Sequence, residues 1–83
     1  MELAEIVMNP ARQRIFQYLL VHETGTDKEI RKALPDIPIA SLYRHIKILA
    51  DSSILMVVGE NRIRGTVESV YQLNEVYVRT LWR

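Results

Sequence analysis

Two prolines three residues apart, Pro35 and Pro38, constrain the fold of this chain more than any other feature. Proline fixes φ and lacks the N–H that a helix interior needs, so it ends a helix or opens one. Apolar residues at helical spacing stand on both sides of the pair. The sequence therefore predicts a short helix that ends at Pro35, a turn at Asp36–Ile37, and a helix from Pro38 to about Ser52.

The rest of the chain supplies three more helices and one hairpin. Asn9 is a good N-cap and Pro10 fits the first helical position after it. Gly25 is expected to be a turn residue, and Thr26 to Glu29 has the pattern of a capping box that opens the short helix before Pro35. The other expected elements are helices at 2–8, 10–22 and 75–83, strands at 54–58 and 67–73, and a polar loop at 59–65.

This order of elements predicts a mainly α fold with a small β-hairpin. Two helices joined by a tight turn and followed by a hairpin have the layout of a winged helix-turn-helix. We expect residues 1–83 to form a single domain, because a chain of this length has room for one core. Phe16 and Leu20 are expected to turn inward. The predicted core consists of Ile15, Leu19, Ile30, Leu34, Leu42, Ile46, Leu49 and Leu55.

The composition narrows the class of protein further. The chain has no cysteine, which excludes a disulfide framework, a thiolate zinc site and a cysteine nucleophile. Its acidic N-terminus does not resemble a signal peptide, and no apolar run approaches the roughly 20 residues that span a bilayer. We therefore expect a soluble protein of the cytoplasm that needs no cofactor.

Charge is distributed unevenly along the chain, although its formal net value is only +1. The segment from Lys28 to Arg64 carries seven basic and four acidic residues, and the outer segments carry the compensating negative charge. The basic middle segment therefore indicates that the helix after Pro38 and the hairpin are the parts that contact a partner.

The helix over residues 39–51 has one apolar and one basic side. At 100° per residue, Leu42, Ile46 and Leu49 fall within roughly 60° of one another and predict the buried stripe. Small residues at the N-terminal end of the outer side allow close approach to DNA, and an arginine there can read guanine. The residues expected to contact DNA from this helix are Ala40, Ser41, Tyr43, Arg44 and Lys47.

The hairpin adds two arginines, Arg62 and Arg64, at its expected tip. Arginine at such a tip suits backbone phosphates or a narrow minor groove. Lys28, near the start of the short helix, is expected to touch a flanking phosphate. Taken singly, the basic residues of the helix and Lys28 fit a solvated surface better than a DNA contact, and the hairpin arginines fit both equally, so the prediction depends on their shared arrangement.

Three segments resemble the arsenic-repressor-like (ArsR-type) winged-helix regulators: residues 9–15, 41–49, and the hairpin at 60–65 with 70–73. The resemblance implies a dimeric, sequence-specific transcription factor, often a repressor, that acts on double-stranded DNA. The chain departs from this family in two respects. Ser53 stands where many such proteins have glycine in a left-handed conformation, and no cysteine is present for thiolate metal sensing. Relatives with this hairpin are generally longer, so we expect a C-terminal effector region beyond Arg83.

Enzymatic activity is not expected, because the sequence lacks a glycine-rich phosphate loop, a nucleophile elbow and a paired-carboxylate motif. The two histidines lie far apart in the sequence and make a zinc site improbable. His45 lies at the edge of the buried stripe, where we expect a structural imidazole bonded to the backbone. His22 is expected at a helix C-terminus, where a cation is favoured.

The terminal helices carry more apolar surface than a small domain needs. These helices either pack on each other or form a homodimer interface, and a symmetric dimer implies a palindromic operator. The expected interface residues are Leu3, Ile6, Val7, Val78, Leu81 and Trp82. The alternative function is a winged-helix module for protein interaction or assembly that does not bind DNA.

Overall fold

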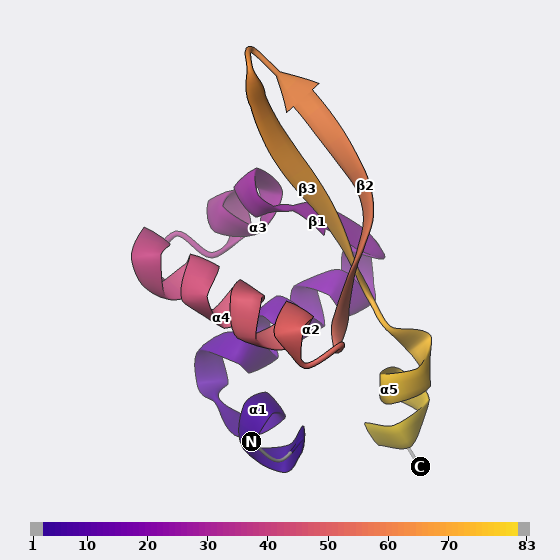
Figure 1. The fold of residues 1–83 in the computed structure, drawn as a ribbon. Coiled ribbons are helices and arrows are strands. Elements are labelled where there is room, and N and C mark those ends of the chain that lie inside the picture. Colours follow the sequence, from indigo (N-terminus) through magenta and orange to yellow (C-terminus); the bar gives the residue numbers. More distant parts are fainter. Residues whose placement is uncertain (1–2, 82–83) are drawn as a thin grey trace.

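The computed structural model describes the backbone of residues 3–81 and the side chains of residues 5–79. Its elements follow the predicted order with one addition, a short strand before the third helix (Figure 1). The helices are α1 (Leu3–Met8), α2 (Pro10–His22), α3 (Asp27–Ala33), α4 (Ile39–Asp51) and α5 (Glu75–Leu81). The strands are β1 (Thr24–Thr26), β2 (Leu55–Ile63) and β3 (Thr66–Leu73).

Local side-chain chemistry fixes where the helices begin. The Asn9 side chain accepts hydrogen bonds from the backbone N–H groups of Ala11 and Arg12, at 3.0 and 3.3 Å, and Pro10 occupies the first turn of α2. Thr26 and Glu29 form the predicted capping box in both directions, at 3.0 and 3.1 Å. These contacts satisfy backbone donors that a helix start otherwise leaves unpaired.

The structure has a three-stranded antiparallel sheet in the order β1-β3-β2. Gly25, expected as a turn residue, is the middle residue of β1 and pairs with Tyr71. A three-residue strand that includes glycine has no alternating apolar pattern, so β1 could not be predicted from periodicity. Ile54, expected in β2, lies in a bend just before that strand begins.

The hairpin is longer than predicted, because residues 59–63 continue β2 and do not form a loop. Its turn consists of Arg64 and Gly65 alone, both with positive φ, of 50° and 81°. Positive φ at both central residues is the geometry of a type I′ turn, which matches the twist of paired strands. The hairpin tip extends beyond the helices, as Figure 1 shows, and residues 60–67 are exposed.

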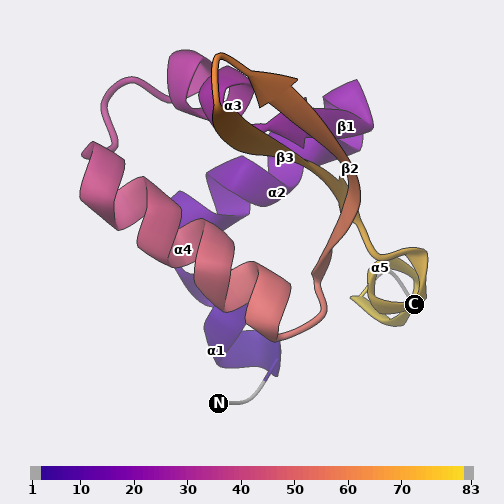
Figure 2. The ribbon, with the colours of Figure 1, turned by 45° about the horizontal axis from the view of Figure 1, so that its top comes forward.

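The core lies between α2, α3, α4 and the base of the sheet (Figure 2). Every predicted core residue is buried there, and Ile6, Ile37, Ile54 and Leu73 join them. Phe16 is half-buried against the core, whereas Leu20 is 41% exposed, so the prediction for Leu20 was wrong. Across the described residues, no helix combines the length and the hydrophobicity needed to cross a bilayer.

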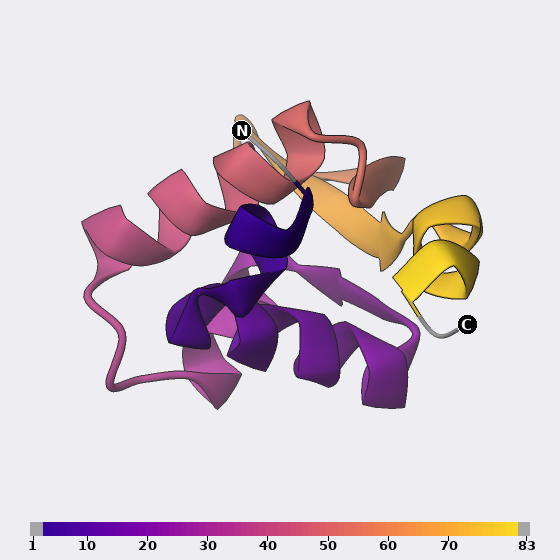
Figure 3. The ribbon, with the colours of Figure 1, turned by 90° about the horizontal axis from the view of Figure 1, so that it is seen from below.

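The terminal helices lie at the end of the molecule opposite the hairpin tip (Figures 1 and 3). Ile6 is 3% exposed and belongs to the core, so it is not available to a partner in this arrangement. Val7 and Val78 are half-buried against the same core. The side chains of Leu3 and Leu81, and all of Trp82, lie outside the described residues.

Candidate nucleic-acid interface

The helix after Pro38 presents the two sides that the sequence predicted. Leu42, Ile46 and Leu49 are buried on one side of α4, and Ala40, Arg44 and Lys47 are exposed on the other. Tyr43 is 40% exposed on one flank, and Ser41 is half-buried on the other. The outer side of α4 is therefore not covered by the described part of the chain.

The basic side chains of this surface have no acidic partner. Within residues 5–79, the ion pairs join Arg14 to Asp36 and Arg79 to Glu75. No hydrogen bond or ion pair engages the side chains of Lys28, Arg44, Lys47, Arg62 or Arg64 in that range. Five cationic groups thus remain available to an external anion, which is the electrostatic condition for binding a phosphate backbone.

The two hairpin arginines lie in different parts of the hairpin, one in a strand and one in the turn. Arg62 lies within β2 and pairs across the hairpin with Val67, whereas Arg64 forms half of the tip turn. Thr66 Oγ1 donates to the Ile63 carbonyl at 2.7 Å and braces that turn. The expectation that both arginines sit at the tip is therefore correct only for Arg64.

A cleft of about 170 Å³ separates the hairpin from the helices. Lys28 and Arg31 of α3, Tyr43 of α4, and Ile63 of the hairpin line it. Arg31 was not among the predicted contact residues, although its position three residues after Lys28 places the two side chains on the same face of a helix. Lys28, Arg31 and Lys32 also border a second hollow against Ile39 at the start of α4.

Acidic groups lie in the same cleft. Burial raises the pKa of Asp27 above its usual value, and the neighbouring Glu68 charge raises it further, while the Tyr71 hydroxyl opposes this shift. Burial also raises the pKa of Tyr71, and the Asp27 charge adds to that effect. These carboxylates reduce the positive potential of the cleft.

The two histidines have the following surroundings. His22 stacks on Tyr18 with ring centroids 4.1 Å apart, and its Nδ1 lies 3.0 Å from the Tyr18 carbonyl oxygen. His45 Nδ1 accepts a hydrogen bond of 3.2 Å from Arg12 Nε. The expected backbone partner of His45 is therefore replaced by an arginine side chain from α2, a contact between distant residues that sequence spacing does not reveal.

Taken together, the helix pair, the hairpin and the exposed α4 surface define a winged helix-turn-helix, a class of fold that DNA-binding transcriptional regulators use. A family model described as a helix-turn-helix domain matches residues 7–58. This match covers more than half of the sequence, so the chain belongs to that helix-turn-helix family.

One solved structure with a similar fold is that of the transcriptional regulator homologue protein from Pyrococcus horikoshii OT3. The TM-score is 0.75 and the sequence identity is 22%, with 94% of this chain and 75% of that chain covered. At this level of sequence identity, the structural similarity supports the assignment of the fold. A search of curated proteins found no match to the chain.

Proposed function

We propose that this chain binds double-stranded DNA sequence-specifically as a transcriptional regulator, with α4 in the major groove. In this arrangement the N-terminal half of α4 meets the base edges, and Arg44 reads a guanine through a bidentate contact. Ser41 and Tyr43 flank Arg44, and Lys47 contacts a phosphate. The hairpin follows the backbone or the minor groove, with Arg62 and Arg64 on phosphates.

A single observation carries this proposal: the outer side of α4 is exposed and its basic groups lack partners within the described residues. A surface helix used only for solubility commonly balances its charges through pairs three or four residues apart. Among residues 39–51, Asp51 is the sole acidic residue, against Arg44 and Lys47. This excess of basic over acidic side chains on α4 favours an anionic partner.

The proposed regulator acts as a homodimer on a palindromic operator, most simply as a repressor of the arsenic-repressor-like type. Two-fold symmetry sets the two copies of α4 about 34 Å apart, one turn of DNA. Val7 and Val78, half-buried near the surface at the end opposite the hairpin, support a role for the terminal helices in that dimer.

The mutation Arg44→Ala tests the base-reading role. We expect the variant to lose about 1–3 kcal/mol of binding free energy on the preferred duplex and to discriminate less at one base pair. Lys47→Ala is the matched control, because it removes a cation from the same face and should weaken all duplexes equally. Unchanged binding of the best duplex by Arg44→Ala would exclude this role for Arg44.

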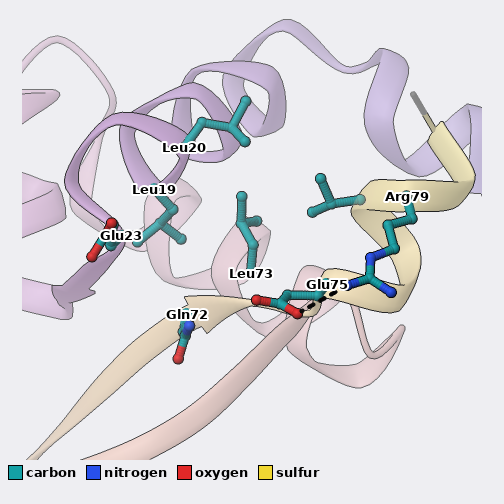
Figure 4. A pocket seen from close by; sticks show the side chains of 8 residues that line it. Leu19, Leu20, Glu23, Gln72, Leu73, Glu75 and Arg79 are labelled. Atoms are coloured by element: carbon teal, nitrogen blue, oxygen red, sulfur yellow. Dashed lines mark ion pairs between the residues drawn. The ribbon is translucent and has the colours of Figure 1, made fainter. Parts of the chain in front are cut away.

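The second candidate function is a protein-interaction module. A hollow of about 500 Å³ lies between the end of α2, the end of β3 and α5 (Figure 4). Apolar Leu20 and Val78 and charged Glu23 and Arg79 are among the residues that line it. A salt titration separates the two functions, because phosphate contacts release counterions and make DNA binding fall steeply with salt. Failure to bind any duplex from a random pool would favour the interaction module.

A further inference from the structure

The Arg12 guanidinium joins three helices at one point. Its Nε donates to His45 Nδ1 of α4 at 3.2 Å, and its Nη1 donates to the Ile6 carbonyl in the last turn of α1 at 3.0 Å. Arg12 itself lies in the first turn of α2, beneath the Asn9 cap. His45 of α4 is thus bonded to the guanidinium of Arg12, a residue of α2 that is also bonded to α1.

This contact determines which ring nitrogen of His45 carries the proton. An arginine side chain has only donors and stays charged, so its partner Nδ1 must present a lone pair. The ring is then neutral, with its hydrogen on Nε2. Burial lowers the pKa of His45, and the charges of Arg12 and Arg44 lower it further, which keeps the ring neutral near pH 7.

The Nε2–H group of His45 opens to solvent. No hydrogen bond engages it within the described residues, and no buried side-chain nitrogen or oxygen there lacks a partner. A donor that is neither bonded nor buried must reach the surface. His45 lies four residues after Ser41 and four before Leu49, so this donor stands at the edge of the buried stripe, on the same side of α4 as Ser41.

We propose that the His45 Nε2–H donates a hydrogen bond to a DNA backbone phosphate at the edge of the groove entered by α4, and that Arg12 is the positioning residue for this ring. The proposal rests on the proposed function and adds a contact to it. A phosphate is the acceptor because His45 lies on a flank of α4, where the strand passes, while Arg44 occupies the centre that faces the bases.

A neutral donor gives this contact a distinct experimental signature. Lysine or arginine on a phosphate releases a counterion, so its removal lowers both the affinity and the slope of affinity against salt. Removing the His45 donor lowers the affinity for every duplex and leaves the slope unchanged. This signature separates His45 from Lys47 on the same helix.

The experiment compares His45→Gln with His45→Asn in the whole chain. A glutamine amide reaches the position of Nε2 and keeps a donor there, whereas an asparagine amide reaches only the position of Nδ1. The probes are a duplex selected by the wild-type protein from a random pool and an unrelated duplex. We expect His45→Gln to stay within about twofold of the wild type, and His45→Asn to lose about tenfold on both duplexes at constant salt slope.

The role of Arg12 has its own readout, the ring ¹⁵N chemical shifts of His45. In the wild type these shifts should report a single tautomer with the proton on Nε2, and Arg12→Leu should produce a mixture. In the His45→Asn background, Arg12→Leu should change the affinity less than it does in the wild type. Unchanged ring shifts in Arg12→Leu would overturn the positioning role.

The remaining outcomes distinguish a failure of the His45 phosphate contact from a failure of the proposed DNA-binding function. If the wild type binds DNA and His45→Asn binds equally well, the phosphate contact is wrong and the proposed function stands. If the loss in His45→Asn is confined to one base pair, His45 reads a base and the phosphate assignment is wrong. If the wild type binds no duplex, the proposed function itself fails.

Discussion

Arg14 holds the carboxylate of Asp36 with two guanidinium nitrogens, one of them at 2.9 Å, and so ties α2 to the turn between α3 and α4. The two side chains are 41% and 64% exposed. The contact therefore lies at the surface, directly at the turn that the two prolines enclose. It helps to fix the direction in which α4 leaves the turn.

The mutation Asp36→Asn tests this pair through its pH dependence. The hydrogen bond from Arg14 holds the pKa of Asp36 below its ordinary value of 3.8, so the pair stabilises the fold above that pH and is lost as the pH falls. We expect a small decrease in melting temperature at pH 7 that shrinks below pH 3.8. An equal decrease at pH 7 and at pH 2 would show that the ion pair is not its cause.

The mutation Gly25→Ala should destabilise the fold by about 1–3 kcal/mol, because overpacking forces neighbouring atoms apart. A Cβ at Gly25 would lie 2.8 Å from Tyr18 Cε1 and 3.3 Å from atoms of both Leu19 and Ile30. Gly59→Ala is the matched control, since its Cβ would meet only Val70 at 3.8 Å. Urea unfolding measures both variants, and equal free energies of unfolding would contradict the packing argument.

The mutation Ser53→Gly should stabilise the fold by about 0.5–1 kcal/mol. Ser53 has φ of 62°, a left-handed conformation that costs an L-residue about 1 kcal/mol and that glycine adopts freely. The hydrogen bond from Asn74 Nδ2 to the Ser53 carbonyl, 2.9 Å long, is kept because it uses the backbone. Ser52→Gly, at φ of −88°, should instead lower the free energy of unfolding, and the same urea experiment tests it.

Removal of either hairpin arginine should weaken binding to all duplexes alike. We expect Arg62→Ala and Arg64→Ala each to reduce the salt slope of DNA binding by about 1, because in the proposed complex each arginine neutralises one phosphate. Arg79→Ala is the control, since Arg79 pairs with Glu75 on α5 at the opposite end of the molecule. A slope that changes as much in the control would show a general charge effect instead of hairpin contacts.

The stability of the fold should fall in acid through His45. Its pKa in the folded chain lies below the ordinary value of 6.5, so neutral His45 stabilises the fold above that pH, and this contribution is lost as the pH falls through the folded pKa. The pKa of Asp27 is raised in the folded chain, so its titration makes the fold more stable as the pH falls. The measurement is therefore the difference in free energy of unfolding between the wild type and His45→Gln, which should narrow below pH 6.5.

Much of the fold could be predicted because its signals are local. The caps at Asn9 and Thr26 and the prolines that enclose the turn each act within a few residues, and the structure confirms them. The buried stripe of α4 follows from helical spacing alone. The left-handed backbone at Ser53 was also correctly expected.

The parts that were missed depend on contacts between distant residues. The strand around Gly25 exists because Tyr71 pairs with it, and residues 59–63 are a strand because β3 runs alongside them. The bond between Arg12 and His45 spans 33 positions in the sequence. For the site, helix geometry predicted the outer side of α4, but the cleft that includes Arg31 requires the hairpin to be placed against α3.

Thr26 serves two elements at once, since it is the last residue of β1, paired with Val70, and the N-cap of α3. One peptide unit therefore links the sheet to the helix that precedes the turn. Residues 70–72 of β3 are therefore joined to the first turn of α3 through the paired residues of β1. The fold thus has a direct mechanical connection between its outermost arm and the helix pair, without any intervening linker.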